Sequence, residues 1–515
     1  MTNQTSNSLQ QEDSNLFFMK ADKFLEKTAE YVHLGINPGD YYKAIWTRDA
    51  AFILKDQFLT GDTYNVLRSL YFIWTHQIDL NDEKVIYGRG SPELKFSSST
   101  ADRETKERFR GALPSTIYHR HGFSEVYAQN PDIDSTALMI STTSWILDVY
   151  LRAGLYSYFE NLQEWASISS SLDPSFLPES AANPLSSADY YKKQKSSLIT
   201  APYNPPLEII PRPIELIEFL VPRMLSALDY LTSRDIDNDG LLEQGYNEDW
   251  MDTALRAGKI VYSQASWILA VSNLSSLLYE IDHKPMASKL MAMAERTVNA
   301  VEEKLWSEED GAYIDLYNGA NDKQSSYNQY NKGRRMLTQD TSLYLVSITE
   351  NTFNDILGMR FNRDNDGGID NLTAANKRKK QSSSHLEAPK KFLEQRASST
   401  LAALKNRVWL DSRWPLVTEK EWERTGPWLL DSNQYHNHTF WPWITGIEML
   451  ARSRFKRYRE CNELLSILTQ GSHPQTLAFY EWINPKTGGG HGAFPFRTGI
   501  STIRVALTDV MLSRL

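Results

Sequence analysis

This sequence has little cysteine, no long apolar run and no excess of positive charge. The single cysteine, Cys461, excludes an intrachain disulfide and a cluster of thiolate-bound metal, and it suits a reducing compartment, so we expect a cytoplasmic protein. No apolar run reaches the roughly 18 residues that span a bilayer. The first residues have neither the basic nor the apolar region of a signal peptide, so we expect no membrane partner.

The charge balance also excludes classes of partner. Asp and Glu number 64 against 55 Lys and Arg, which gives a formal net charge of -9. Nucleic acid and anionic membranes would meet no general attraction, so a neutral substrate fits better. The chain has 515 residues, 41% of them hydrophobic, so it can bury a large core, and its length allows one to four domains. Oligomeric state is not indicated.

Helical periodicity dominates the chain. Trp267, Val271, Leu274 and Leu278 share one face of a predicted helix, and a similar pattern begins at Ile503. The other segments with this periodicity are residues 16–32, 50–59, 64–75, 136–151, 214–230, 287–305 and 440–452. With about a dozen helices and few alternating strands, we predict an all-α fold.

The predicted division is a disordered tail over residues 1–15 and a single catalytic domain over 16–515. Residues 157–212, rich in Ser and Pro, and residues 364–392 interrupt the helical pattern and are interpreted as surface insertions. The basic run 377–380 in the second insertion favours a solvated loop over a nuclear signal or an RNA patch. The stretch 235–240 resembles the start of a calcium loop, but Tyr246 stands where that loop has Glu, so a turn is favoured.

Two motifs precede predicted helices. Arg48 and Asp49 follow Trp46, and such a pair can grip sugar hydroxyls while the indole packs on the apolar face of the ring. The same residues also suit a capping Asp49 paired with Arg48. Asp134 stands just before an apolar segment, where an N-cap is the alternative to a sugar ligand.

The segment 247–259 holds two acids. If it is helical, Asp249 and Asp252 share a face and each raises the pKa of the other, which a carboxylic acid that must stay protonated near neutral pH needs. Trp250 between them favours a semi-buried site over a solvated acidic turn.

Two further motifs are aromatic. Tyr435, His436 and Asn437 are followed by Trp441, and the alternative to a binding site is a core histidine in an aromatic cluster. Glu481 lies between Tyr480 and Trp482 and before a glycine-rich loop, where it can hold a water or simply hydrogen-bond in the core.

The order of these motifs resembles a family of glycosidases. Residues 46–62 are similar to the Arg-Asp helix of glucoamylases and of alkaline/neutral invertases, and Asp134-Ser135 resembles a stretch of those invertases. Met251-Asp252, with Arg256, Gly258 and Gln264 after it, resembles the catalytic-acid segment of invertases and of the amylo-α-1,6-glucosidase part of glycogen debranching enzymes. Residues 435–442 resemble their Tyr-His-Asn-Gly and Trp-Pro motif, and residues 479–488 resemble the base-bearing segment of processing α-glucosidase I.

That resemblance implies an (α/α)6 barrel and an inverting glycoside hydrolase that acts on a carbohydrate substrate. We expect no cofactor and no metal in the site, and the sequence does not indicate whether a structural calcium is bound. Asp252 would be the general acid and Glu481 the general base, and inversion implies carboxyls roughly 6.5–9.5 Å apart. The resemblance implies that the sugar is bound by Trp46, Arg48, Asp49, Asp134, His436 and Trp441. We also expect sugar contacts from the other polar and aromatic residues of these segments, Asp249, Trp250, Gln264, Tyr435 and Asn437.

Some positions depart from the family pattern and leave alternatives open. His438 replaces the expected glycine, which adds bulk and a titratable ring, and Asp249 is an alternative to Asp252 as the acid. The favoured reaction is the release of glucose from an α-glucan branch or oligosaccharide; cleavage of sucrose or of a glucosylglycerate-type solute is the alternative. A sugar epimerase or lyase using His436 and His438, and an inactive carbohydrate-binding relative, are the alternatives of other classes.

Overall fold

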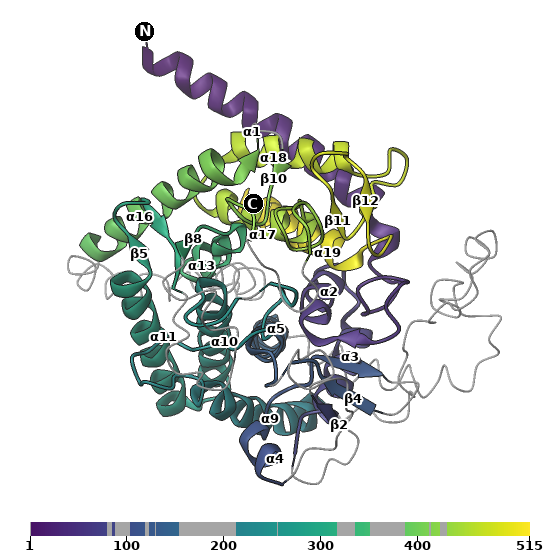
Figure 1. Ribbon diagram of the computed structural model, residues 1–515, viewed down its shortest axis with the longest axis vertical. Helices are drawn as coiled ribbons and strands as arrows, with labels where there is room; N and C mark the ends of the chain where they lie inside the picture. Colours follow the sequence, from purple (N-terminus) through teal and green to yellow (C-terminus); the bar gives the residue numbers. More distant parts are fainter. Residues whose placement is uncertain are drawn as a thin grey trace, which may run out of the picture.

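Helices dominate the chain in the computed structural model, which describes residues 2–79, 85–87, 103–118, 123–128, 130–153, 213–254, 256–316, 335–350, 387–410, 414–422 and 430–514. Six of them form an inner ring: α2 (Thr47–Leu59), α5 (Ile133–Arg152), α10 (Val261–Glu280), α13 (Ser342–Ser347), α17 (Pro442–Arg454) and α19 (Arg497–Arg514). Each packs against the next, and α19 packs back against α2, so the ring closes (Figure 1).

A second set of helices alternates with the first along the chain and forms the outer ring. Its members are α1 (Thr2–Lys27), α3 (Thr63–Thr75), α9 (Pro213–Thr232), α11 (Lys284–Lys304), α16 (Glu387–Ala403) and α18 (Tyr458–Gly471). Helix α9 packs on α5, α11 on α10, and α18 on both α17 and α1. Six outer-inner pairs in two concentric rings are an (α/α)6 toroid, so the predicted fold is confirmed.

Burial explains which helix belongs to which ring. In α5, 17 of 20 residues are buried, and the same holds for α10, because neighbours surround both helices. In α11 only 6 of 21 residues are buried, and they lie along one face of the helix. The inner helices are rich in Ser, Thr and Ala, whose small side chains allow close packing all round.

The predicted helical segments are confirmed, and the pattern missed others. The long helices predicted over residues 16–32, 136–151 and 440–452 correspond to α1, α5 and α17. The short helix α13, the outer helices α16 and α18, helix α4 (Arg103–Phe109), the 3-10 turns Ala29–Tyr31 and Gln339–Thr341 and the π-helical turn Leu404–Val408 were not predicted.

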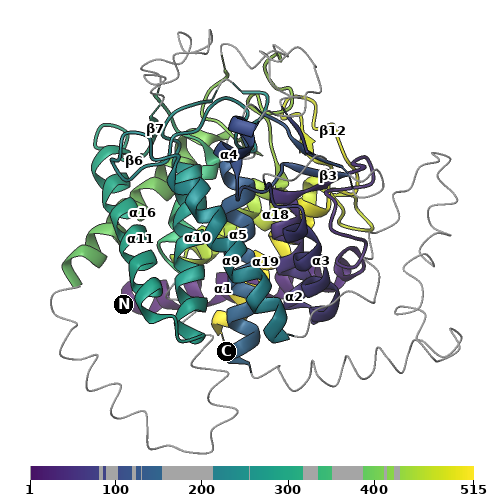
Figure 2. The ribbon, with the colours of Figure 1, turned by 90° about the horizontal axis from the view of Figure 1, so that it is seen from below.

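Short strands cap one end of the helices (Figure 2). Four form a sheet in the order β1-β3-β4-β2, from Ile45–Trp46, Thr116–Tyr118, Phe123–Val126 and Val85–Tyr87; β2 and β4 are parallel and the other neighbours antiparallel. Four antiparallel pairs complete the set: β5 (Trp306–Ser307) with β6 (Ala312–Tyr313), β7 (Asp315–Leu316) with β8 (Arg335–Met336), β9 (Trp409–Leu410) with β10 (Trp414–Pro415), and β11 (Trp482–Ile483) with β12 (Gly490–His491). Strand β1 runs directly into α2, and β11 and β12 lie just before α19 in the chain.

Only some of the segments in the predicted domain division lie among the described residues. Residues 2–15, predicted as a disordered tail, form the first half of α1, which extends beyond the body of the molecule (Figure 1). The insertion 157–212 lies outside the described residues, and so do residues 364–386 of the second, while 387–392 begin α16. The division into one domain stays a prediction.

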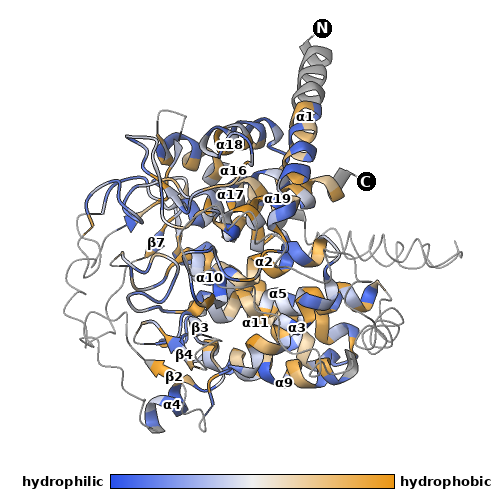
Figure 3. Cartoon of the chain, turned by 90° about the vertical axis from the view of Figure 1, so that its right-hand side faces the viewer, coloured by the Kyte–Doolittle hydropathy of each residue, from blue (hydrophilic) through white to orange (hydrophobic). Residues whose placement is uncertain are grey.

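Polar and apolar residues are separated in space. In Figure 3 the helices carry most of the apolar residues, and the loops are largely hydrophilic. Across the part of the chain that the structure describes, no helix is both long enough and apolar enough to cross a bilayer.

Candidate active site

The candidate site lies where the inner helices begin. A cavity of about 430 Å³ is lined by residues at or just before the first turns of α2, α17 and α19 and by the loop that precedes α10. The backbone N–H groups at these helix starts give the region a partial positive charge, which favours the buried carboxylates gathered here.

The cavity brings together residues from distant parts of the sequence. Half of its 18 lining residues are candidates from the sequence: Trp46, Arg48, Asp49, Trp250, Asp252, Tyr435, His436, Trp441 and Glu481. The two predicted catalytic carboxyls therefore face the same hollow.

The surroundings of Asp252 favour the protonated form of its carboxyl more than water does. Its segment consists of turns and not the helix considered from the sequence, so Asp249 and Asp252 do not share a helix face. Oδ1 of Asp252 is buried and has no hydrogen-bond partner within the described structure, and it lies 3.6 Å from Nδ1 of His436. Burial raises the pKa of Asp252; the charge of Arg48 opposes this, that of Glu481 adds to it, and the pKa reaches about 7.

Glu481 is held as an acceptor. The Tyr42 hydroxyl donates to its Oε1, the Tyr435 hydroxyl donates to the same oxygen over 3.3 Å, and the Ala493 N–H donates to Oε2 over 2.9 Å. Burial raises the pKa of Glu481, and these hydrogen bonds to the ionised form lower it, leaving a net rise. A Cβ at Gly492 would come within 2.3 Å of Oε2, so this glycine makes room for the carboxylate.

Arg48 is fixed between two carboxylates. Its Nη1 lies 3.4 Å from Oδ2 of Asp134, and its Nη2 lies 3.6 Å from Oδ2 of Asp49. Thr498 on α19 donates to Oδ1 of Asp49 over 2.7 Å. Arg48 and Asp49 thus offer a rigid donor and acceptor pair to the cavity.

Aromatic rings form much of the wall. Trp250 meets His436, Trp441 and Trp443 edge to face, with ring centroids 5.1 to 5.5 Å apart. His436 stacks on Trp441, and its Nδ1 lies 2.9 Å from the Thr253 hydroxyl. Burial and the charges of Arg48 and Arg256 hold the pKa of His436 well below its usual value, so the ring is neutral.

Four sequence candidates for sugar binding lie outside the lining. Asp134 is the second residue of α5, where it pairs with Arg48 instead of capping the helix. Asp249 accepts from Gln244 over 2.8 Å and pairs with Arg256 at 3.2 Å.

The other two of these candidates bind backbone groups. The side chain of Gln264 bonds Leu242 N and O, and that of Asn437 accepts from Trp422 N over 2.8 Å. Both side chains are buried, and their polar atoms are used to fix neighbouring loops.

The bulk and the titratable ring that His438 adds lie outside the cavity lining. Its backbone has a φ of +62°, in the left-handed region that glycine adopts without strain. Its Nδ1 lies 2.9 Å from the Thr418 carbonyl oxygen, and it is absent from the lining.

Sequence reasoning missed several lining residues. These are Pro38, Tyr41, Tyr42, Tyr127, Thr253, Leu430, Trp443, Gly492 and Phe496. The Tyr41-Tyr42 pair, close before Trp46, is an aromatic signal that could have been followed. The contact of Tyr42 with Glu481 has no signal, because 439 positions separate them.

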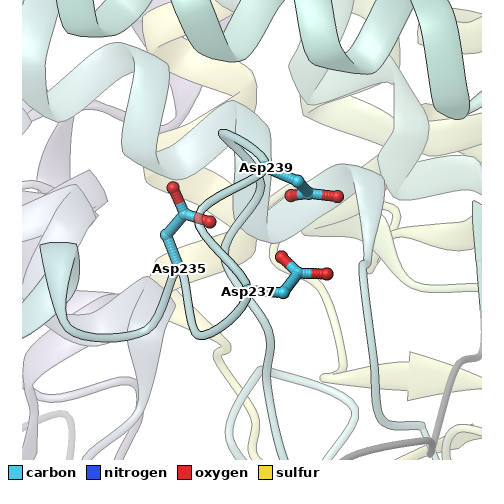
Figure 4. Close-up of side chains that lie close together, drawn as sticks. All are labelled: Asp235, Asp237 and Asp239. Atoms are coloured by element: carbon cyan, nitrogen blue, oxygen red, sulfur yellow. The ribbon is translucent and has the colours of Figure 1, made fainter.

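The calcium-like stretch is a turn, as the sequence favoured. The carboxylates of Asp235, Asp237 and Asp239 lie within 4.8 Å of one another (Figure 4). Lys259 Nζ binds Asp237 at 2.7 Å and also contacts Asp239. Lys304 binds Asp239 at 2.6 Å, so the chain's own cations neutralise the cluster.

Comparison with known proteins finds similar folds among solved structures. No family model matches the chain, and no curated protein matches its sequence. Among solved structures, a GH63 mannosylglycerate hydrolase from Thermus thermophilus, in complex with Tris and D-glycerate, is 14% identical with a TM-score of 0.48, covering 95% of this chain and 99% of that one. A single-substitution variant of a glycosidase is 9% identical with a TM-score of 0.50, covering 97% and 98%. The chain therefore shares its fold with a solved glycosidase over nearly its whole length.

Proposed function

We propose that the chain is an inverting, exo-acting glycoside hydrolase that releases glucose from an α-glucoside, an α-glucan branch or an oligosaccharide. The observation that carries this proposal is a pair of carboxyls in one cavity with opposite environments. Among the residues that the structure describes, none donates a hydrogen bond to the buried Oδ1 of Asp252, and the pKa of Asp252 is about 7. Glu481 instead accepts hydrogen bonds from two hydroxyls and a backbone N–H. Environments that separate two carboxyls in this way assign one as acid and one as base.

In the proposed reaction Asp252 donates its proton to the glycosidic oxygen while the bond to the anomeric carbon breaks. Glu481 accepts a proton from a water that attacks that carbon from the opposite face, so the product has the inverted configuration. The carboxyls then stand roughly 6.5–9.5 Å apart, with the water between Glu481 and the sugar.

We assign the acid to Asp252 and not to Asp249. Asp249 is absent from the cavity lining, and its oxygens are engaged by Gln244, the Met251 N–H and Arg256. Burial raises the pKa of Asp249, although the charge of Arg256 opposes this, so Asp249 is set apart from Asp252 by its place outside the cavity lining. Its charge still helps to raise the pKa of Asp252.

The sugar itself would be held by polar and aromatic groups. Arg48 can donate to hydroxyl oxygens and Asp49 can accept from hydroxyl hydrogens, while Trp46 and Trp441 offer flat apolar faces. A neutral His436 adds a hydrogen-bonding group without charge. This combination suits a neutral pyranose.

One experiment tests the substrate and the stereochemistry together. The protein is incubated with sucrose, maltotriose, isomaltose, a limit dextrin and glucosylglycerate, and the first-formed anomer is followed by NMR. We expect β-glucose from maltotriose, isomaltose or the limit dextrin. Turnover of sucrose or glucosylglycerate alone would move the assignment to those substrates, and an α-anomer would refute inversion.

We expect a bell-shaped dependence of kcat/KM on pH. Activity is lost as the pH rises through about 7, because ionised Asp252 has no proton to donate. It is also lost as the pH falls, because Glu481, whose pKa is raised above its ordinary value, becomes protonated and cannot accept one. Initial rates at low substrate concentration across the pH range measure both limbs, and a rate that keeps rising with pH would contradict the role of Asp252.

A further inference from the structure

Tyr41 stands out among the cavity residues by its exposure. It lines the cavity, yet 75% of its surface is open to solvent, whereas Glu481 in the same lining is 3% exposed. A single exposed tyrosine is ordinary on a protein surface. A tyrosine that is both exposed and part of a cavity lining marks where that cavity opens.

The loop that carries Tyr41 is fixed in place. The Asn37 side chain donates to the carbonyl oxygens of Gly39 and Tyr42 over 2.9 and 3.0 Å. Arg497 at the start of α19 donates from its guanidinium to Oδ1 of Asn37 over 2.6 Å and from its backbone N–H to the Pro38 carbonyl oxygen over the same distance. The backbone under Tyr41 is therefore held by a helix from the other end of the chain.

Close packing fixes the loop from its other side as well. A Cβ at Gly39 would approach the Pro495 carbonyl oxygen to 2.8 Å, so the loop lies directly against the segment before α19. An aromatic ring on such a loop is presented to a ligand without a large loss of backbone freedom on binding.

Tyr41 also begins a series of contacting rings that leads to the proposed base. Its ring meets that of Tyr42 edge to face at 5.4 Å, and Tyr42 meets Trp46 at 5.8 Å. The Tyr42 hydroxyl donates to Glu481. The series thus runs from the cavity opening to the carboxylate beside which the enclosed sugar would react.

We propose that Tyr41 is the platform for the sugar ring on the leaving-group side of the cleaved bond. This inference rests on the proposed function. An exo-acting enzyme encloses one terminal sugar, so the rest of the substrate has to pass the opening of the cavity. The exposed face of Tyr41 stacks there on the apolar face of the second pyranose ring, as tyrosine rings do with flat apolar surfaces.

Two substrates separate this role from a general structural one. The first is the best disaccharide among those cleaved, and the second is α-glucosyl fluoride, which has no second sugar. For Tyr41→Ala we expect kcat/KM for the disaccharide to fall about tenfold, mainly through a higher KM, and kcat/KM for the fluoride to stay within about twofold. Tyr41→Phe keeps the ring and should keep most of the disaccharide activity.

Tyr279 provides the matched control. It is also an exposed tyrosine, at 58%, but it lies in the last turn of α10, away from the helix starts that form the cavity. Tyr279→Ala should leave both substrates unaffected. An equal loss of both activities in Tyr41→Ala, or no loss with the disaccharide, would overturn the platform. Wild-type protein that cleaves neither substrate would refute the proposed function itself, and the platform with it.

Discussion

The Asp252→Asn variant should be about a thousandfold less active than the wild type on α-glucosides whose leaving group needs a proton. This loss lies within the range of about 10² to 10⁴ that a general acid usually contributes to the rate. The amide has nearly the shape of the carboxyl but no transferable proton at neutral pH. The same variant should cleave α-glucosyl fluoride within about tenfold of the wild-type rate, because fluoride departs without full protonation. Steady-state rates on both substrates measure the contrast.

The stability of Asp252→Asn provides the first control. The folded-state pKa of about 7 lies above the ordinary value of 3.8, so the folded form binds this proton more tightly than the unfolded form does. Stability contributed by this group is therefore present at low pH and is lost as the pH rises through about 7. The neutral Asn side chain has no such dependence, so its thermal unfolding above this pH should not fall below that of the wild type.

A second variant separates the two acids of the segment. Asp249→Asn weakens the pairing with Arg256, which also binds Asp340 at 2.7 Å and Asp315 at 3.1 Å. We expect lower stability and similar losses on both substrates. If Asp249→Asn instead spares the fluoride while Asp252→Asn keeps glycoside hydrolysis, the two assignments are exchanged.

Helical periodicity was sufficient to predict most of the long helices, and the family resemblance predicted their arrangement in two rings, but neither predicted the loops that face the cavity. Helices α5 and α10 repeat apolar residues at helical spacing over 20 residues each, and that signal is local. The strands that cap them have two to four residues, which is too short for an alternating pattern to be recognised. Within the turns at 247–254, Asp249 pairs with buried Arg256 at 3.2 Å, a contact that local spacing does not reveal.

For the site, the sequence indicated which residues lie near the cavity better than it indicated which of them line it. Asp252, Glu481 and Arg48 do lie in one cavity, as the order of motifs suggested. Gln264 and Asn437 belong to the same motifs but bond loop backbone, because a buried loop beside a helix start needs partners for its own N–H and C=O groups. In sequence, a polar residue that supports a site and one that lines it look alike.

Glu481→Gln should abolish hydrolysis of both the α-glucosides and α-glucosyl fluoride, by about 10³-fold or more, as removal of a general base predicts. Water still has to be deprotonated when the leaving group is fluoride, so this variant differs from Asp252→Asn, which spares the fluoride. The amide oxygen can still accept from Tyr42 or Tyr435, so glucose binding should persist. Calorimetric titration with glucose, beside rate measurements on both substrates, checks each part.

Glu481→Ala with added azide tests the geometry of the base directly. Removing the carboxylate opens space where Oε1 and Oε2 stood, and azide needs no deprotonation to attack the anomeric carbon. α-Glucosyl fluoride and azide should then give β-glucosyl azide and fluoride, restoring turnover that water cannot support in this variant. Asp252→Asn, which keeps Glu481, should show no such rescue. An α-configured azide would place the nucleophile on the wrong face of the sugar, and wild-type hydrolysis by either Glu481 variant would show that another residue activates the water.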